Sequence, residues 1–195
     1  MAQPTETLIV PPGYPQEGFE LDLLISRESL QERNREIAAE LSTRFAGQNP
    51  VFVGVLNGAV LFLSDLIRLM TIPLEIDFLK IASYGDSTKS TGTIRVDKDL
   101  NADINGRAVV IVEDIVDTGL SLTYLKQHFE SKSPSDIVIV TCLWKKEVFK
   151  GTVRPDLVGF EVPDRFVIGY GLDYAQQYRG LPDVYAFKEE ALHEL

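Results

Sequence analysis

The sequence predicts an α/β fold in which a parallel β-sheet is flanked by helices. Apolar segments without polar alternation, such as VFVGVL and IVIVTCLW, recur along the chain and are separated by segments with helical periodicity. This order is typical of a parallel sheet covered on both faces. The unusual polar residues fall at the ends of the strand-like segments: Asn57-Gly58, residues 113–121, Lys145-Lys146 and Asp173. Ligands of such sheets bind beyond the carboxyl ends of the strands, so a functional crevice is expected there.

Length, charge and cysteine content limit the class of protein. The 195 residues suit one domain, and a hydrophobic fraction of 45% is ordinary for a globular protein. A net charge of −10 disfavours nucleic acid or an anionic membrane as the main partner but leaves phosphate ligands open. Cys142 is the only cysteine, which excludes an intramolecular disulfide. Because no secretory signal or membrane-length apolar stretch is visible, we expect a cytoplasmic protein without membrane or nucleic acid partners.

The first half of the chain begins with an arm rich in Pro and Gly and then alternates between helical and strand-like patterns. Helices are expected over residues 27–45 and 59–70. Strands are expected over residues 51–56, 74–84 and 93–100. Ser26 is a good N-cap for the first helix, because its hydroxyl can accept a hydrogen bond from the first turn, and Gly47 and Pro50 end that helix. Residues 85–93, GDSTKSTGT, contain no apolar side chain to pack, which predicts a mobile loop.

The second half of the chain continues the same alternation. Strands are expected over residues 109–112, 137–144, 157–162 and 166–172, and one helix over residues 120–129. No repeat and no low-complexity segment interrupts this order. The whole chain therefore predicts one domain built on a parallel sheet, or such a domain with a small appended piece.

The clearest functional signal is EDIVDTGLSL, residues 113–122, which follows an apolar strand and opens a helix. A strand-to-helix turn leaves backbone N–H groups unpaired, so Thr118, Gly119 and Ser121 fit a phosphate held by amides, hydroxyls and the helix dipole. The turn has no lysine, unlike the GxxxxGK[ST] loop of nucleoside triphosphatases. Glu113 and Asp114 would repel a bare phosphate but suit sugar hydroxyls or a divalent metal. A bare D-T-G also fits an ordinary helix cap, whereas the full order favours a sugar phosphate.

VVIVEDIVDTGLSL resembles the phosphoribosyl diphosphate (PRPP) binding motif of the type I phosphoribosyltransferases, and in particular their 6-oxopurine branch. The similarity spans about residues 22–183 and includes, in order, VGVLNGAVLF, Ser83-Tyr84, CLWKK and RPDLVGFEVPDRFVIGYGLDYAQQYRGLP. It implies one domain over residues 1–195, with a core of about 22–150. A small hood would be formed by the N-terminal arm and the C-terminal segment of about 155–190.

The resemblance assigns a role to each residue of the acidic turn. Glu113 and Asp114 match the acid pair that holds the ribose hydroxyls. Asp117 matches the catalytic acid that faces the purine N7 and takes part in proton transfer. The segment that wraps the 5′-phosphate corresponds to Asp117, Thr118, Gly119, Leu120 and Ser121.

Residues later in the chain match the groups that bind the base. Lys145 matches a lysine that donates to the purine O6 and so selects an oxo base. Phe166 matches the aromatic residue that stacks on the purine, and the backbone of Val167 would contact the base edge. Asp173 matches a carboxylate near a magnesium ion and the 2-position of the base. Taken alone, Lys145 also fits a surface lysine and Phe166 a core residue.

Leu56, Asn57 and Gly58 match the pyrophosphate loop, and Arg179 matches an arginine that binds pyrophosphate oxygens. The family loop is usually Leu-Lys-Gly, and Asn57 brings no positive charge. We therefore expect pyrophosphate binding to depend on backbone amides, Arg179 and magnesium. Asn-Gly is also a common turn pair, and an arginine such as Arg179 also fits a surface ion pair.

The resemblance also implies a lid and a metal. Ser83 and Tyr84 begin the polar loop, which in the family closes over the site and excludes water. Mg²⁺ is the implied cofactor, with Asp173, Glu113 and Asp114 as its candidate ligands.

The implied function is transfer of the phosphoribosyl group from PRPP to N9 of hypoxanthine and also guanine. A xanthine-preferring or pyrimidine-directed transferase is an alternative, although the Lys145 and Phe166 segments argue against a pyrimidine. A second alternative is a PRPP-binding regulator without catalysis, which would not need Asp117, Lys145, Asp173 and Arg179 together. Relatives form homodimers or homotetramers, and the same is expected here.

Overall fold

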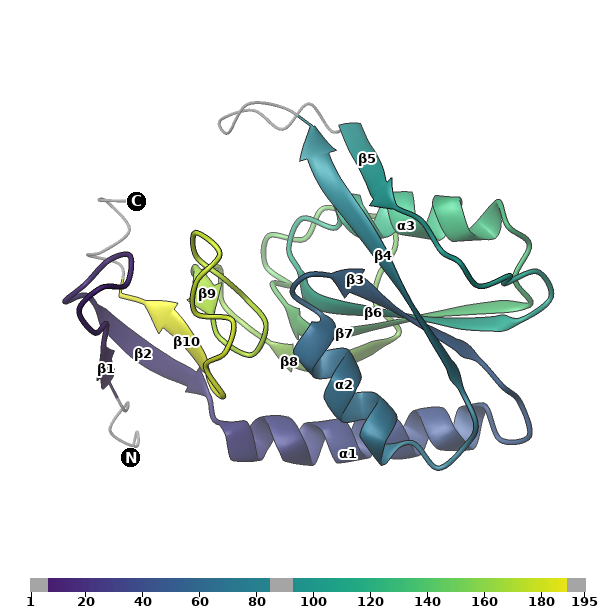
Figure 1. Cartoon of the computed structure of the whole chain (residues 1–195), viewed down its shortest axis with the longest axis horizontal. Coiled ribbons are helices and arrows are strands. Elements are labelled where there is room, and N and C mark those ends of the chain that lie inside the picture. The colour runs from purple at the N-terminus through teal and green to yellow at the C-terminus, as the bar shows by residue number, and fades with distance from the viewer. Residues whose placement is uncertain (1–6, 85–92, 189–195) are drawn as a thin grey trace.

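The computed structural model describes residues 7–84 and 93–188, which form two sheets and three helices (Figure 1). The larger sheet has the order β5-β4-β3-β6-β7-β8 and the smaller sheet the order β1-β2-β10-β9. The strands of the larger sheet are β3 (Val51–Leu56), β4 (Glu75–Tyr84), β5 (Thr93–Lys98), β6 (Ala108–Val116), β7 (Asp136–Trp144) and β8 (Leu157–Glu161). Those of the smaller sheet are β1 (Thr7–Ile9), β2 (Glu20–Ile25), β9 (Val167–Ile168) and β10 (Val184–Phe187). The helices are α1 (Arg27–Arg44), α2 (Val60–Leu69) and α3 (Leu120–Glu130).

Both faces of the larger sheet are covered, which explains its lack of polar alternation. Strands β4, β3, β6, β7 and β8 run parallel, and β5 pairs antiparallel with β4. Helices α1 and α2 lie on one face and α3 on the other (Figure 1). Phe52 and Val110 belong to the core on the side of α1 and α2, whereas Val53 and Ile111 belong to the core that contains Leu125 of α3. The predicted parallel sheet flanked by helices is confirmed.

The local signals of the first helix are also confirmed. Ser26 caps α1, and its Oγ accepts a hydrogen bond from the backbone N–H of Ser29 at 3.3 Å. Leu30, Ile37 and Leu41 lie on one face of α1 and are buried in the core. The helical spacing of the apolar residues therefore determines which face of this helix packs on the sheet.

Four expectations about strands are corrected. The strand expected over 109–112 continues to Val116, because its backbone pairs with β7 through the acidic positions. The strand expected over 166–172 is limited to β9, since only those two residues pair with β10 and the backbone then turns left-handed. Strand β8, expected in the hood, pairs with β7 in the larger sheet, and β2, expected to open the core, lies in the smaller sheet.

The predicted lid residues Ser83 and Tyr84 are the last two of β4, where they pair with Ile94 and Thr93 of β5. Residues 85–92, which make up most of the predicted lid loop, lie outside the described residues. No helix among the residues that the structure describes has the length and apolar character needed to cross a membrane.

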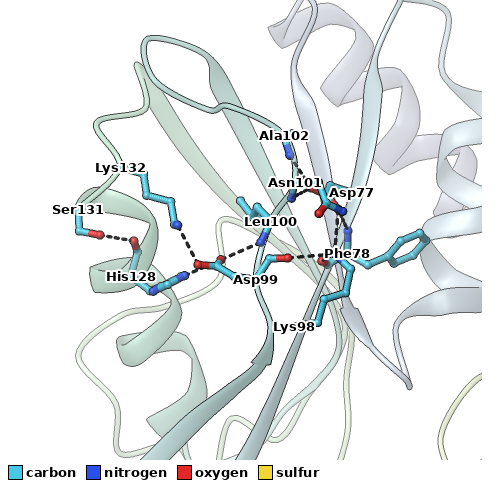
Figure 2. Close-up of polar contacts among 10 residues, drawn as sticks. All are labelled: Asp77, Phe78, Lys98, Asp99, Leu100, Asn101, Ala102, His128, Ser131 and Lys132. Carbon is cyan, nitrogen blue, oxygen red and sulfur yellow. Dashed lines mark hydrogen bonds and ion pairs between the residues drawn. The ribbon is translucent and has the colours of Figure 1, made fainter.

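Asp77 on β4 holds the chain that leaves β5 (Figure 2). Its side chain is buried and accepts hydrogen bonds from the backbone N–H groups of Phe78 (2.7 Å), Asn101 (2.6 Å) and Ala102 (2.8 Å). The ammonium of Lys98 lies 3.2 Å from the same carboxylate. Burial opposes ionisation, but these four donors together hold the pKa of Asp77 below its ordinary value.

Asp99 then ties the same segment to α3 (Figure 2). Its carboxylate lies 2.9 Å from Nε2 of His128 and 2.9 Å from Nζ of Lys132, near the C-terminal end of that helix. Burial opposes ionisation, but the contacts with His128, Lys132 and the Leu100 N–H keep the pKa of Asp99 well below its usual range. The return strand of the β4–β5 hairpin is therefore fixed to the helix that begins at the predicted phosphate turn.

Candidate active site

The predicted site residues lie where the larger sheet changes its direction of winding. The chain passes from β3 through α2 to β4 on one side, and from β6 through α3 to β7 on the other. The loops after β3 and β6 therefore diverge from neighbouring strand ends, which is where ligands bind in open α/β sheets. These ends are in close contact, because a Cβ added at Gly58 would lie 1.5 Å from Oδ2 of Asp114. Only glycine fits at this position of the loop.

Glu113 and Asp114 are held in an environment that disfavours their charged forms. Burial raises the pKa of Glu113 well above its ordinary value, and the negative charge of Asp114 adds to this shift. Burial also raises the pKa of Asp114 to about 6, although the N–H of Ile115, 2.8 Å from Oδ1, and the charge of Arg179 act in the opposite direction. Strongly shifted pKa values are common at functional sites, so these two carboxyl groups are candidates for contact with a ligand.

The raised pKa of Asp114 predicts that this residue costs stability in the ligand-free protein. The carboxyl group has an ordinary value of 3.8 and about 6 in the folded state, so folding favours its protonated form. The loss of stability caused by the Asp114 carboxylate is absent when the pH is below the ordinary pKa of 3.8, and it is complete when the pH is above about 6. We expect Asp114→Asn to raise the free energy of unfolding by on the order of 1–3 kcal/mol at pH 7.5. This gain should shrink as the pH is lowered toward 4 in urea titrations monitored by circular dichroism.

Asp136→Asn is a suitable control for this measurement, because the side chain of Asp136 is 44% exposed and forms a surface ion pair with Arg44. Its effect should remain within about 1 kcal/mol at every pH. A loss of stability in Asp114→Asn at pH 7.5 would contradict the prediction, since it would mean that the folded protein favours the ionised carboxylate.

The predicted phosphate turn lies between the end of β6 and the start of α3. Gly119 is the N-cap of α3 with φ 85°, a left-handed conformation, and a Cβ there would lie 2.3 Å from the Phe149 ring. Within residues 7–84 and 93–188 no side chain caps α3, so the first N–H groups of this helix lack a partner from such a cap. Thr118, Leu120 and Ser121 are exposed beside them. The turn presents unpaired amides and two hydroxyls to solvent, which suits an anion.

Lys145 follows β7 and joins the phosphate turn to the segment before β9. Its Nζ lies 3.4 Å from Oδ2 of Asp117 and 3.0 Å from Oδ1 of Asp164, and its side chain is only 11% exposed. Its backbone N–H donates to the carbonyl of Val116 at 2.9 Å. The structure therefore brings the predicted proton-transfer residue and the predicted base-selecting residue into direct contact.

Asp164 was not among the residues predicted from the sequence. It precedes Phe166 by two residues, and its contact with Lys145 links the two segments expected to bind the base. An acid in the VPDRF segment was visible in the sequence, but nothing local indicated which cation it would meet. The pairing depends on β7 and the segment 162–166 meeting at one edge of the sheet, as Val162 N–H donates to the Trp144 carbonyl at 2.9 Å.

Phe166 is exposed beside β9, and Val167 is buried in that strand. The Phe166 ring is 40% exposed, and Tyr174 meets it edge-on at 5.7 Å between ring centroids, with an interplanar angle of 84°. Phe187 packs against it at 5.9 Å. An aromatic ring that is supported by other rings but remains accessible is suited to stack on a planar ligand.

Asp173 and Arg179 form an ion pair with 2.7 Å between Oδ1 and Nη2. Arg179 also donates through Nη1 to the carbonyl of Gly171 at 2.8 Å. Gly171 in turn touches the loop after β3, because a Cβ on it would lie 2.0 Å from the carbonyl oxygen of Gly58. Asp173 and Arg179 are therefore placed beside the predicted pyrophosphate loop, in which Asn57 is exposed and the Leu56–Asn57 peptide bond is cis.

The acidic residues offer oxygen ligands that fit a magnesium ion held in part by substrate. Among the residues that the structure describes, no group of three His, Cys, Asp or Glu side chains could hold a metal. Mg²⁺ commonly binds one or two carboxylates together with water and substrate phosphates. Asp114 and Asp173 suit this arrangement, since the negative charge of Asp173 is close enough to help raise the pKa of Asp114. Glu113 is the least suited of the three predicted ligands, because burial favours its protonated form.

Comparison with known proteins finds relatives of this chain within one family. Residues 26–175 match the family described as Phosphoribosyl transferase domain. The chain is 45% identical over 166 residues to a hypoxanthine-guanine phosphoribosyltransferase from Bacillus subtilis, covering 85% of this chain and 92% of the relative. It is 41% identical over 175 residues to an enzyme of the same name from Aquifex aeolicus, covering 88% and 97%.

Solved structures agree with the sequence matches. A hypoxanthine phosphoribosyltransferase from Staphylococcus aureus superposes with a TM-score of 0.83 at 38% identity, covering 87% of this chain and 92% of that chain. A hypoxanthine-guanine phosphoribosyltransferase from Bacillus anthracis gives a TM-score of 0.82 at 41% identity, covering 86% and 98%. The likeness therefore extends over nearly the full length of these relatives.

Proposed function

This chain belongs to the phosphoribosyl transferase family, and from that membership we propose that it transfers the 5-phosphoribosyl group from PRPP to N9 of hypoxanthine or guanine. The products are the corresponding nucleoside monophosphate and pyrophosphate, and the process it serves is purine salvage. The observation that supports this most directly is the contact of Lys145 with Asp117 at the end of the phosphate turn. One crevice then serves the sugar phosphate and the base together.

The turn from Asp117 to Ser121 binds the 5′-phosphate of PRPP. Its support is the uncapped N-terminus of α3, where backbone N–H groups and the helix dipole favour an anion. Glu113 and Asp114 bind the ribose hydroxyls. Burial disfavours the charged form of both carboxyl groups, and the sugar hydroxyls supply further hydrogen-bond donors when the substrate binds.

The base lies between Lys145 and Phe166. The Lys145 ammonium donates a hydrogen bond to O6, so it favours hypoxanthine and guanine over a base that carries an amino group there. Phe166 stacks on the purine ring, and the backbone of Val167 contacts its edge. Asp117 exchanges a proton with N7 as the bond from N9 to the ribose forms.

The pyrophosphate leaves between the loop of residues 56–58 and Arg179. Arg179 contributes charge-assisted hydrogen bonds, and the loop contributes backbone N–H groups where the usual lysine is Asn57. When bound, Mg²⁺ supplies positive charge that neutralises the leaving group, and Asp114 and Asp173 would hold it. The carboxylates near the ribose also stabilise the positive charge that develops on its C1 atom.

An assay of pyrophosphate release with PRPP and each of four bases tests this function. We expect turnover with hypoxanthine and guanine, none with adenine, and loss of turnover when EDTA removes the divalent metal. Turnover restricted to xanthine would favour the alternative of a xanthine-preferring enzyme. Binding of PRPP without turnover of any base would instead favour a PRPP-binding regulator.

A further inference from the structure

Residues 169–173, called the strap below, follow β9 and carry Asp173 at their end. Gly169, Tyr170 and Gly171 have positive φ angles of 94°, 49° and 102°. A bulky side chain such as that of Tyr170 rarely adopts this left-handed conformation, and it persists only where surrounding contacts determine it. Two backbone hydrogen bonds between Gly169 and Leu172, at 3.1 and 3.0 Å, close this turn, and contacts with other segments fix its place in the fold.

The phenol group of Tyr170 supplies this fixation. Its hydroxyl accepts a hydrogen bond from Nδ2 of Asn34 on α1 and donates one to Oδ2 of Asp65 on α2, each at 2.7 Å. Tyr170 and Asn34 are 7% and 2% exposed, so water does not replace Asn34, whereas the Asp65 side chain is 34% exposed. Burial, with the hydrogen bond to Asp65, raises the pKa of Tyr170 far above its ordinary value, so the hydroxyl remains a donor. One side chain thus joins the strap to both helices on this face of the sheet.

The strap meets α2 at a second point, immediately before the first turn of that helix. A Cβ on Gly171 would lie 2.0 Å from the carbonyl oxygen of Gly58, so strap and pyrophosphate loop touch through their backbones. Gly171 also exchanges two hydrogen bonds with Arg179, from its N–H to the Arg179 carbonyl at 2.9 Å and from Nη1 of Arg179 to its carbonyl at 2.8 Å. The position of Tyr170 thus sets the position of Arg179 relative to Gly58.

We propose that Tyr170 is a positioning residue for pyrophosphate binding, acting through Asp65 and Asn34. It fixes the strap so that Arg179 and Asp173 face the loop of residues 56–58, and it does not itself touch substrate. The proposal rests on the proposed function of this site. It adds that the affinity for the pyrophosphate group of PRPP depends on a buried hydrogen bond on the helix-covered face of the sheet.

Tyr170→Phe tests the proposal, because it keeps the ring and removes only the hydroxyl. We expect the KM for PRPP to rise about tenfold, because the variant loses the hydrogen bonds of the hydroxyl with both Asn34 and Asp65. The value of kcat at saturating PRPP should change less than about threefold and the KM for hypoxanthine less than about twofold, since Lys145 and Phe166 are undisturbed. Initial rates over PRPP and hypoxanthine concentrations give all three values. Calorimetric titration with PRPP and Mg²⁺ gives the affinity without turnover.

Substitutions of Asp65 test the same hydrogen bond from the side of its acceptor. Asp65→Asn retains an oxygen acceptor and should raise the KM for PRPP less than Asp65→Ala does. The double variant Tyr170→Phe with Asp65→Ala should be no worse than about the larger single effect, because both changes remove the same interaction. Tyr124→Phe on α3 is the matched control, since it removes a tyrosine hydroxyl far from the strap and should leave all kinetic values unchanged.

A lower melting temperature in Tyr170→Phe with a KM for PRPP within about twofold of wild type would overturn the proposal, because the role would then be structural only. A fall in kcat with unchanged KM would also overturn it. Should Tyr170→Phe fail to fold, the KM for PRPP of Asp65→Asn is compared with that of Asp65→Ala, and equal values close to that of the wild type would overturn the proposal. If the wild-type protein turned over no base, the proposed function would fail, yet weaker PRPP binding by Tyr170→Phe in calorimetry would still support this positioning role.

Discussion

Asp117→Asn is expected to lower kcat by about 10²–10⁴-fold, the usual contribution of a general acid or base. Asparagine keeps the size of the side chain and can still meet Lys145, whose ammonium lies 3.4 Å from Oδ2 of Asp117. It cannot accept the proton that passes to or from N7. The affinity for PRPP and for the base should change by much less, since the phosphate turn that follows is retained. Initial rates at saturating PRPP, together with calorimetric binding of PRPP, separate the two effects.

Asp136→Asn again serves as the control, because the residue is exposed and lies at the start of β7, away from the crevice. It should have the turnover of the wild-type protein. If Asp117→Asn kept its turnover, Asp117 would have no part in the chemistry. A large rise in the KM for PRPP without a change in kcat would instead assign Asp117 to phosphate binding alone.

Lys145→Ala is expected to lower kcat/KM for hypoxanthine by on the order of 10²-fold and to weaken the discrimination against adenine. The ammonium is almost fully enclosed and lies between Asp117 and Asp164. Its removal takes away the donor for O6 and leaves two carboxylates without their shared cation. Rates with hypoxanthine and adenine, each at saturating PRPP, measure both effects.

The neighbouring lysine offers a matched control within the same sequence pair. Lys146 is exposed and pairs with Glu161 at 2.7 Å, so Lys146→Ala removes a cation one residue from Lys145 without touching the crevice. It should leave kcat/KM and base selectivity unchanged. If Lys145→Ala kept the selectivity of the wild-type protein, another group would have to recognise the 6-position of the base.

The sequence was most informative where one short segment determines both structure and chemistry. Helix α1 and its Ser26 cap, the buried strands β3 and β7, and the turn that opens α3 all follow from local patterns. The order Glu113, Asp114, Asp117 to Ser121 predicted a sugar phosphate before any contact was known. The loops after β3 and β6, which touch at Gly58 and Asp114, lie at the strand ends where a parallel sheet was expected to bind its ligand.

The sequence was least informative where distant segments meet. Strand β10 has four residues and pairs with β2 from the opposite end of the chain, so no local pattern marked either strand as part of the smaller sheet. The predicted strand over 166–172 was wrong because the backbone of GYGL, although apolar in sequence, turns into the left-handed conformation after β9. The partner of Lys145 at Asp164 was also missed, since ion pairs between separate loops leave no spacing signal.

The sequence by itself determined the order of helices and strands around the larger sheet, the parallel arrangement of that sheet and the residue types at its strand ends, because hydrophobic period and turn chemistry act over a few neighbouring residues. Only the tertiary structure decided which of these residues meet. The contact of Lys145 with Asp117, the raised pKa of Asp114 and the joining of Tyr170 to Asn34 and Asp65 are examples. Each depends on burial and on distances between elements far apart in the chain, quantities that arise when the sheet and its helices pack together.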